Sequence, residues 1–83
     1  MKELLYYLVE SLVDNPDAIE IEETERDYEG EPETLFRLRV ASADMGKVIG
    51  RQGRTAKDIR ILLRALASRE GKHVSVDVLD ESE

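Results

Sequence analysis

The sequence predicts an α+β fold with the order helix-strand-strand-helix-helix-strand, giving a three-stranded mixed sheet with helices on one face. Two parts of the chain carry apolar residues at helical spacing, and three short segments alternate apolar and polar residues as strands do. Two helices separate the second strand from the third, so these strands can run parallel through a right-handed crossover. A chain of 83 residues has room for one domain, over residues 1–83.

The first half of the chain predicts one helix and a pair of strands. Five apolar residues at helical spacing predict a helix over residues 2–13, and Pro16 follows as a stop. These five are Leu4, Leu5, Leu8, Val9 and Leu12. Isoleucines alternate with glutamates over residues 18–25, and apolar residues alternate with arginines over residues 36–40, as in half-buried strands. The polar turn region 27–33 between them favours an antiparallel hairpin.

The second half predicts a short helix, a long helix and a last strand. Ser42 is placed to cap a short helix over residues 43–49, which Gly50 ends. A long helix follows over residues 54–69, with Gly71 placed to end it in the left-handed conformation. Its apolar stripe comprises Ala56, Ile59, Leu62, Leu63 and Leu66. Three valines alternate with polar residues over 74–78 in the last strand, and we expect the tail 80–83 to fray.

Charge is distributed unevenly along the chain. The net charge is −7, but residues 44–73 carry 8 basic and 3 acidic side chains, whereas residues 1–43 carry 4 basic and 12 acidic ones. A phosphate group is attracted by the charge of the nearby surface rather than by the net charge of the whole chain, so the basic segment can attract nucleic acid. No apolar run is long enough for a membrane span, and the absence of cysteine fits a cytoplasmic protein without disulfides.

The segment from Met45 to Arg60 is the most informative stretch of the sequence. Gly50 and Gly53 stand three apart between two predicted helices, where a sharp corner needs backbone conformations that other residues resist. The helix after the corner has unpaired N–H groups at its N-terminus, which favour an anion such as phosphate. Arg51, Arg54 and Lys57 add positive charge beside it. Two glycines at this spacing are weak evidence alone, because any tight turn between helices can use them.

The context of the two glycines resembles the KH-domain signature. Val48-Ile49-Gly50-x-x-Gly53 has Lys47 before it and Ile59 after it, and the element order is similar to the type II KH arrangement. From Lys2 to Leu79 the chain resembles the small bacterial single-KH proteins of the KhpA family. This resemblance implies an RNA-binding protein that holds about four single-stranded nucleotides.

The resemblance also assigns expected roles to residues. Gly50, Arg51, Gln52 and Gly53 would clamp the RNA backbone, and the loop 69–73 would face the groove. The flanking site residues are Lys47, Val48, Ile49, Arg54 and Lys57. Members of the family are associated with RNA chaperoning and post-transcriptional regulation, through self-pairing or pairing with a larger KH-containing RNA-binding protein. No cofactor and no metal is implied.

Several of these residues have a second interpretation. Val48, Ile49 and Ile59 fit the core at least as well as the groove floor, and Lys57, Arg60 and Arg64 form a stripe that is commonly a solvated helix face. On the open sheet face, Arg37 and Arg39 are placed to form cross-strand ion pairs with glutamates. We also expect one or more of the three tyrosines to pack against the core.

Other function classes fit less well. With no cysteine and one histidine, His73, the nucleophile-base pairs of an enzyme and zinc sites are nearly excluded. An RNA-recognition motif would need aromatic residues on an open sheet face that here carries charged residues. The alternative that stays open is a KH-like protein-interaction module with little RNA affinity of its own.

Ile61 and Ala65 predict a partner surface on the long helix. Ile61 lies about 140° or more from the centre of the apolar stripe, so it should face solvent in a monomer. Ala65 lies four residues further on the same side, and its small side chain would let a second helix approach closely. A self-complementary pairing through a two-fold axis fits such a surface.

Overall fold

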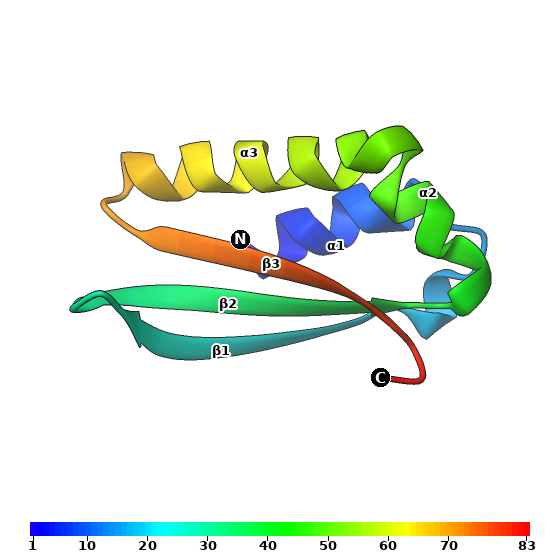
Figure 1. The fold of residues 1–83 in the computed structure, drawn as a ribbon, viewed down its shortest axis with the longest axis horizontal. Coiled ribbons are helices and arrows are strands. Elements are labelled where there is room, and N and C mark those ends of the chain that lie inside the picture. Colours follow the sequence, from blue (N-terminus) through cyan, green and yellow to red (C-terminus); the bar gives the residue numbers. More distant parts are fainter.

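A three-stranded sheet carries helices on one face in the computed structural model, which describes residues 1–83 (Figure 1). The helices and strands are α1 (Lys2–Glu10), β1 (Glu20–Tyr28), β2 (Glu31–Val40), α2 (Met45–Ile49), α3 (Arg54–Arg69) and β3 (His73–Asp80). Three short 3-10 turns join them, at Pro16–Ala18, Ser42–Asp44 and Arg51–Gly53. The predicted α+β class and element order are confirmed, and none of the helices is long and apolar enough to cross a bilayer.

The sheet has the order β1-β2-β3 and is mixed, as predicted. β1 pairs with β2 antiparallel, with Glu22 opposite Arg37, and β2 pairs with β3 in parallel. On the open face, Glu22 lies 4.0 Å from Arg37 and 3.7 Å from Arg39, so the expected cross-strand ion pairs form. β1 and β3 are both edge strands, each with one side of its backbone unpaired.

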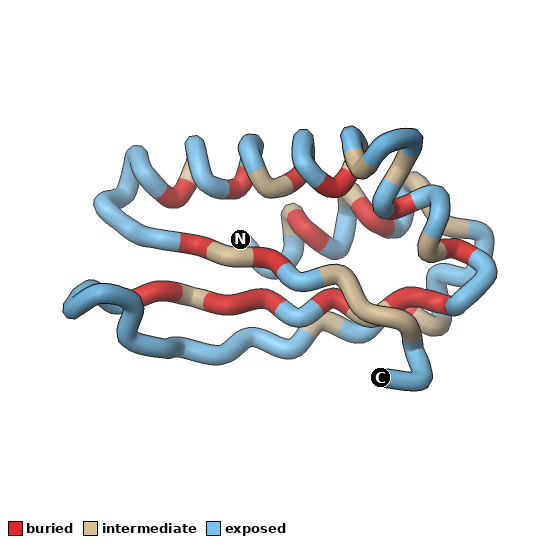
Figure 2. Tube along the Cα trace, in the orientation of Figure 1, coloured by how far each residue is buried: buried red, intermediate tan, exposed pale blue.

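The hairpin between β1 and β2 is longer and its turn tighter than predicted. The strands pair as far as Tyr28 and Glu31, which leaves Glu29 and Gly30 as a two-residue turn instead of a polar region over 27–33. Both turn residues have positive φ, 52° and 84°, as the tight turns that match strand twist require. The strand ends extend past the helices, so their residues are polar although the backbone is still paired (Figure 2).

The core lies between the sheet and the helices, where the buried segments of α1, α3 and the strands face one another (Figure 2). Fully buried residues from each layer meet there. They include Leu5, Val9, Phe36, Leu38, Val40, Val48, Leu63 and Ala67. The stripe predicted for α3 is wrong at one position, because Leu62 is 41% exposed. Ile59, Leu63 and Ala67 face the sheet instead, and Leu62 points about 100° away from Leu63.

Element ends differ from expectation in two places. α1 stops at Glu10 rather than residue 13. Ser42 does not cap α2, because its hydroxyl donates a hydrogen bond to Asp80 Oδ1 at 2.8 Å. The last helical turn of α1 gives way to a hydrogen-bonded turn around Leu12, which leads the chain toward Pro16.

Two other expectations about the periphery do not match the structure. The tail 80–83, which we expect to fray, is hydrogen-bonded at its first two residues. Asp80 is the last residue of β3, and the Glu81 N–H donates to the Val40 carbonyl at 2.9 Å. The three tyrosines Tyr6, Tyr7 and Tyr28 are all exposed rather than packed in the core. The core is therefore built from aliphatic residues and Phe36 alone among the aromatics.

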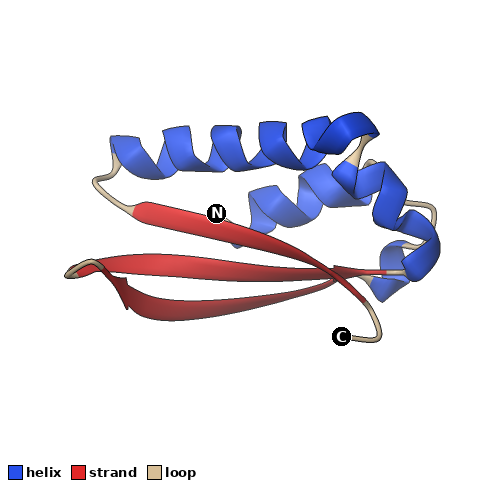
Figure 3. Cartoon of the chain, in the orientation of Figure 1, coloured by secondary structure: helices blue, strands red, loops and turns tan.

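Figure 3 shows how this fold places the glycine corner. α2 and α3 meet at one end of the molecule, and the hairpin turn and the α3–β3 loop lie at the other. α2 and α3 pack against each other and against β3, so packed elements hold the corner on both sides.

Candidate functional site

Gly50 forms the first part of the corner between α2 and α3. Its backbone has φ 78° and ψ 173°, a region that almost only glycine occupies. A Cβ on Gly50 would lie 2.2 Å from Thr55 Oγ1 and 2.9 Å from the Thr55 backbone nitrogen. The chain itself therefore requires glycine at this position, whether or not a ligand binds.

Gln52 and Gly53 complete the corner in the left-handed conformation. Their φ and ψ angles are 58° and 26° for Gln52, and 74° and 11° for Gly53. A non-glycine residue in this region is uncommon, and the strain costs about 1–2 kcal/mol. Arg51 and Gln52 are both exposed, so the corner projects two polar side chains into solvent. Strain of this kind is often found at functional sites.

The corner opens onto the N-terminus of α3, which no side chain of the protein caps. The first N–H groups of a helix lack intrahelical partners, and α3 has no acidic residue in its first turn. The exposed side chains of Arg51, Arg54 and Lys57 lie on and around this first turn. Backbone N–H groups, helix dipole and positive side chains thus favour an anion at one place.

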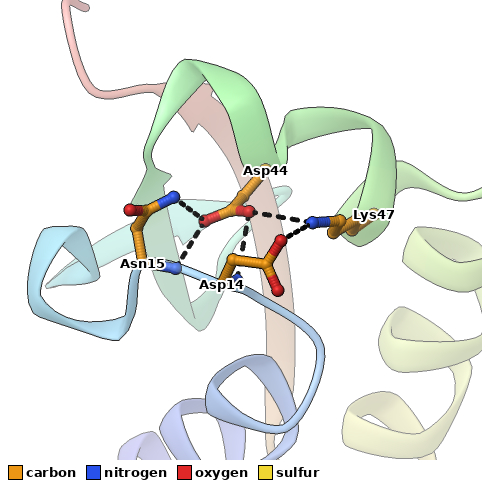
Figure 4. Close-up of polar contacts among 4 residues, drawn as sticks. All are labelled: Asp14, Asn15, Asp44 and Lys47. Atoms are coloured by element: carbon orange, nitrogen blue, oxygen red, sulfur yellow. Dashed lines mark hydrogen bonds and ion pairs between the residues drawn. The ribbon is translucent and has the colours of Figure 1, made fainter.

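Lys47 does not join this group in the structure. Its ammonium pairs with the Asp14 carboxylate and lies 3.6 Å from Asp44 Oδ1 (Figure 4). The hydrogen bond to Asp14 is the main reason that the pKa of Lys47 lies above its usual value. The side chain points toward the turn that follows α1, and two carboxylates balance its charge.

Asp44 is a structural residue of the site whose contacts the sequence did not reveal. Its buried carboxylate accepts hydrogen bonds from the backbone N–H groups of Asp14 (3.1 Å) and Asn15 (3.0 Å), and from Asn15 Nδ2 (3.1 Å) (Figure 4). Burial raises the pKa of Asp44, but these hydrogen bonds and Lys47 outweigh it and hold the pKa below its usual value. An ionised Asp44 thereby ties the turn after α1 to the start of α2.

The apolar residues before the corner divide between core and surface. Val48 is fully buried and Ile59 is buried, as their core interpretation predicts, whereas Ile49 is 36% exposed. Gly46 is exposed three residues before Ile49, and a Cβ added there would meet nothing within 4 Å. α2 therefore exposes Gly46 and Ile49 together on its surface before Gly50. A glycine inside a predicted helix is the signal that could have singled out Gly46.

The loop 69–73, which we expect to face the groove, lies at the other end of α3 from the corner. It follows the 16-residue helix α3, which spans about 24 Å, and stands at the opposite end of the molecule (Figure 1). Two surface cavities lie at that end, where both include Gly71, Lys72 and His73 and neither includes Gly50–Gly53. The candidate site is thus the exposed corner and its basic surroundings rather than an enclosed pocket.

Comparison with known proteins shows the family to which the chain belongs. The family model described as "KhpA/KhpB, KH domain" matches residues 2–78. The chain is 46% identical to the RNA-binding protein KhpA of Clostridium acetobutylicum, over 95% of this chain and 100% of that protein. It is 42% identical to the RNA-binding protein KhpA of Chlamydia trachomatis, over 98% of this chain and 99% of that protein. The corresponding protein of Borreliella burgdorferi is also 42% identical, over 94% of this chain and 90% of its own length. The chain therefore belongs to the KhpA/KhpB family of KH-domain proteins.

Proposed function

We propose that this chain is an RNA-binding protein that holds about four single-stranded nucleotides and grips their backbone with Gly50, Arg51, Gln52 and Gly53. The observation that carries the proposal is the exposed corner at the uncapped N-terminus of α3, with no acid in the first turn. The relatives named above are RNA-binding proteins, which supports the same conclusion. The KH fold is not an enzymatic one, and the chain is a binding protein.

Phosphate and base contacts fall on different parts of the site in this proposal. Arg51, Arg54 and Lys57 are exposed around the helix N-terminus and neutralise phosphates. The apolar face of α2, formed by Gly46 and Ile49, gives a base a surface against which to pack, with buried Val48 beneath it. Lys47 reaches a phosphate only after leaving Asp14 and Asp44, so its contribution is smaller than its charge suggests.

The cellular role within this proposal is that of an RNA chaperone or post-transcriptional regulator in the cytoplasm. A chaperone or regulator must bind many different RNAs. A single domain with a site for a few nucleotides does so because it needs only a short single-stranded segment and does not enclose the RNA. The absence of cysteine fits a reducing compartment. The second candidate is a KH-like protein-interaction module with little RNA affinity, which the net charge of −7 favours.

Titration with labelled single-stranded RNA at a series of salt concentrations tests the proposal. A site that contacts two or three phosphates loses affinity with a log-log slope of about −1.4 to −2.1, at about −0.7 per phosphate. A slope steeper than about −4 means that a much wider surface binds RNA. No binding at low salt would refute RNA binding and leave the interaction module as the function.

Self-association through α3 is a second part of the proposal. Ile61 is 52% exposed, and its neighbours Leu62 and Ala65 are exposed as well, so α3 carries an apolar surface on the side away from the sheet. A small domain gains stability when such a surface is buried against a second copy, and a two-fold axis would bring the same residues together. The alternative to self-association is pairing with a larger KH-containing RNA-binding protein.

We expect Ile61→Asp to convert a dimer into a monomer, because it places a charge at the centre of this surface. Sedimentation at tens of micromolar measures the change, with Thr24→Asp as a control that adds the same charge on the exposed part of β1. Two monomers, or two equally stable dimers, from wild type and Ile61→Asp would show that the surface is wrongly assigned.

A further inference from the structure

β1 forms an edge of the sheet that no other part of the chain pairs with. It is paired with β2 over nine residues without a bulge, and its backbone makes no hydrogen bond on the other side. It contains no proline, and every residue except Ile21 is exposed (Figure 2). At the opposite edge of the sheet, α3 packs against β3, and Arg60 Nε donates to the Val76 carbonyl at 2.9 Å. β1 is therefore the edge to which a further strand can be added.

The two-residue turn at Glu29 and Gly30 determines which backbone groups of β1 are free. The residues that flank such a turn exchange both backbone hydrogen bonds, and bonded and unbonded pairs then alternate along the two strands. Tyr28 and every second residue before it thus bond to β2. The residues between them direct their N–H and C=O groups to the free side. These residues are Ile21, Glu23, Glu25 and Asp27.

Glu23 and Glu25 carry their side chains on the face of the sheet that bears the helices. Glu23 lies opposite the buried Phe36, and the Glu25 carboxylate accepts a hydrogen bond from Thr34 Oγ1 at 2.8 Å. Neither carboxylate forms an ion pair. Beyond the N-terminal end of α1, this face holds a cavity of about 680 Å³. The acidic residues that line the cavity outnumber the basic ones, and they are Glu3, Glu23, Glu25, Glu31 and Glu70.

The charge of β1 decides which strand fits this edge. β1 carries five acidic residues and one basic residue, Arg26. Like charges on directly opposite residues of two strands are destabilising, whereas opposite charges are stabilising. Two copies of β1 paired edge to edge would bring acidic strands together in chains that each carry a net charge of −7. A strand with lysine or arginine at alternate positions would instead supply cations opposite Glu23 and Glu25.

We propose that the free edge of β1 binds a lysine- or arginine-rich extended segment of a partner protein as a fourth strand. Hydrogen bonds to the free backbone groups hold the segment, and the carboxylates of Glu23 and Glu25 select its charge. The basic strand of this chain cannot take that place, because Arg37 and Arg39 lie in β2 at the centre of the sheet. The site lies toward the hairpin turn, away from the glycine corner (Figure 3), and does not depend on RNA binding.

A labelled peptide as long as β1, with alternating lysine and valine, is the probe for this site. Two further peptides carry a methyl group on the backbone nitrogen of every lysine or of every valine. Methylation keeps the positive charge but removes the N–H groups on one side of the strand. Because only one side faces β1, one methylated peptide should bind about as tightly as the parent peptide, and the other at least about tenfold more weakly.

Variants of the chain test the role of charge. Glu23→Gln combined with Glu25→Gln should weaken binding of the parent peptide about fivefold, because two cross-strand charge pairs are lost. Asp58→Asn combined with Glu83→Gln is the matched control, since it removes two exposed acids from α3 and the tail and should change the affinity less than about twofold. Amide hydrogen exchange in the complex should slow at the four residues with free N–H groups, from Ile21 to Asp27.

Contrary results overturn the inference in distinct ways. Equal affinities of the two methylated peptides, or equal weakening by the two double variants, would mean that a polycation adheres to an acidic protein without strand pairing. A complex in which exchange at the four free N–H groups is unchanged would exclude β1 as the site. Slow exchange at these groups without peptide, in a dimer of the chain, would identify a second copy as the occupant instead.

Discussion

Replacing Gly50 with alanine is expected to lower the melting temperature by more than about 10 °C. The new Cβ would sit in a backbone region that costs about 1–3 kcal/mol for any residue but glycine. It would also lie 2.9 Å from the Thr55 backbone nitrogen, which cannot move aside as a side chain can. Since each 1 kcal/mol shifts the melting temperature of a domain this size by roughly 4–8 °C, the combined effect is large.

Gly46→Ala is the matched control for this prediction. It makes the same chemical change four residues earlier, in a helix, where the added Cβ meets nothing within 4 Å. Alanine is favoured over glycine in a helix by about 1 kcal/mol, so Gly46→Ala should melt at the same or a higher temperature. Thermal denaturation followed by circular dichroism measures the melting temperatures of both variants and of wild type. Equal melting temperatures would mean that the corner is not strained as described.

The destabilisation at Gly50 has a consequence for the glycine motif. Loss of RNA binding in a Gly50 variant would reflect a broken corner as readily as a lost contact. The spacing of Gly50 and Gly53 is therefore explained by the conformation of the turn between α2 and α3, and it is not by itself evidence of a contact with RNA. Evidence for the clamp must come from residues whose side chains the fold does not need.

Periodicity was enough to predict the element order, because each helix and strand buries one face against a common core. It failed where a strand continues beyond that core. Most residues on either side of the Glu29-Gly30 turn, from Asp27 to Glu33, are polar, but they pair as strands because backbone hydrogen bonds need no apolar side chain. Periodicity also placed Leu62 in the buried stripe of α3, although this side chain is exposed. The stripe is broad, and the angle at which α3 crosses the sheet decides which side of it is buried.

The candidate site was predictable where it is local in sequence. The two glycines and the basic residues around them lie within one short segment, so their proximity follows from the turn. The contacts of Asp44 and Arg60 were not predictable in this way. Asp44 binds residues 29 and 30 positions away, and Arg60 binds Val76 across 16 positions, so both depend on how the layers pack.

Arg51→Asp combined with Gln52→Asp is expected to abolish tight RNA binding while leaving the fold intact. Both side chains are exposed and make no hydrogen bond or ion pair with the rest of the chain. Aspartate also tolerates the left-handed conformation of residue 52. The two new carboxylates would stand at the uncapped N-terminus of α3 and repel the phosphates that the corner is proposed to hold.

The affinity of this double variant for single-stranded RNA, measured beside its melting temperature, tests the proposed clamp most directly. Ser68→Asp combined with Arg69→Asp is the control, because it makes the same change in charge at two adjacent exposed residues at the other end of α3. We predict a loss of more than about tenfold for the corner variant and less than about twofold for the control. A corner variant that melts like wild type and binds RNA equally well would contradict the assignment of Gly50–Gly53 as the RNA-binding site.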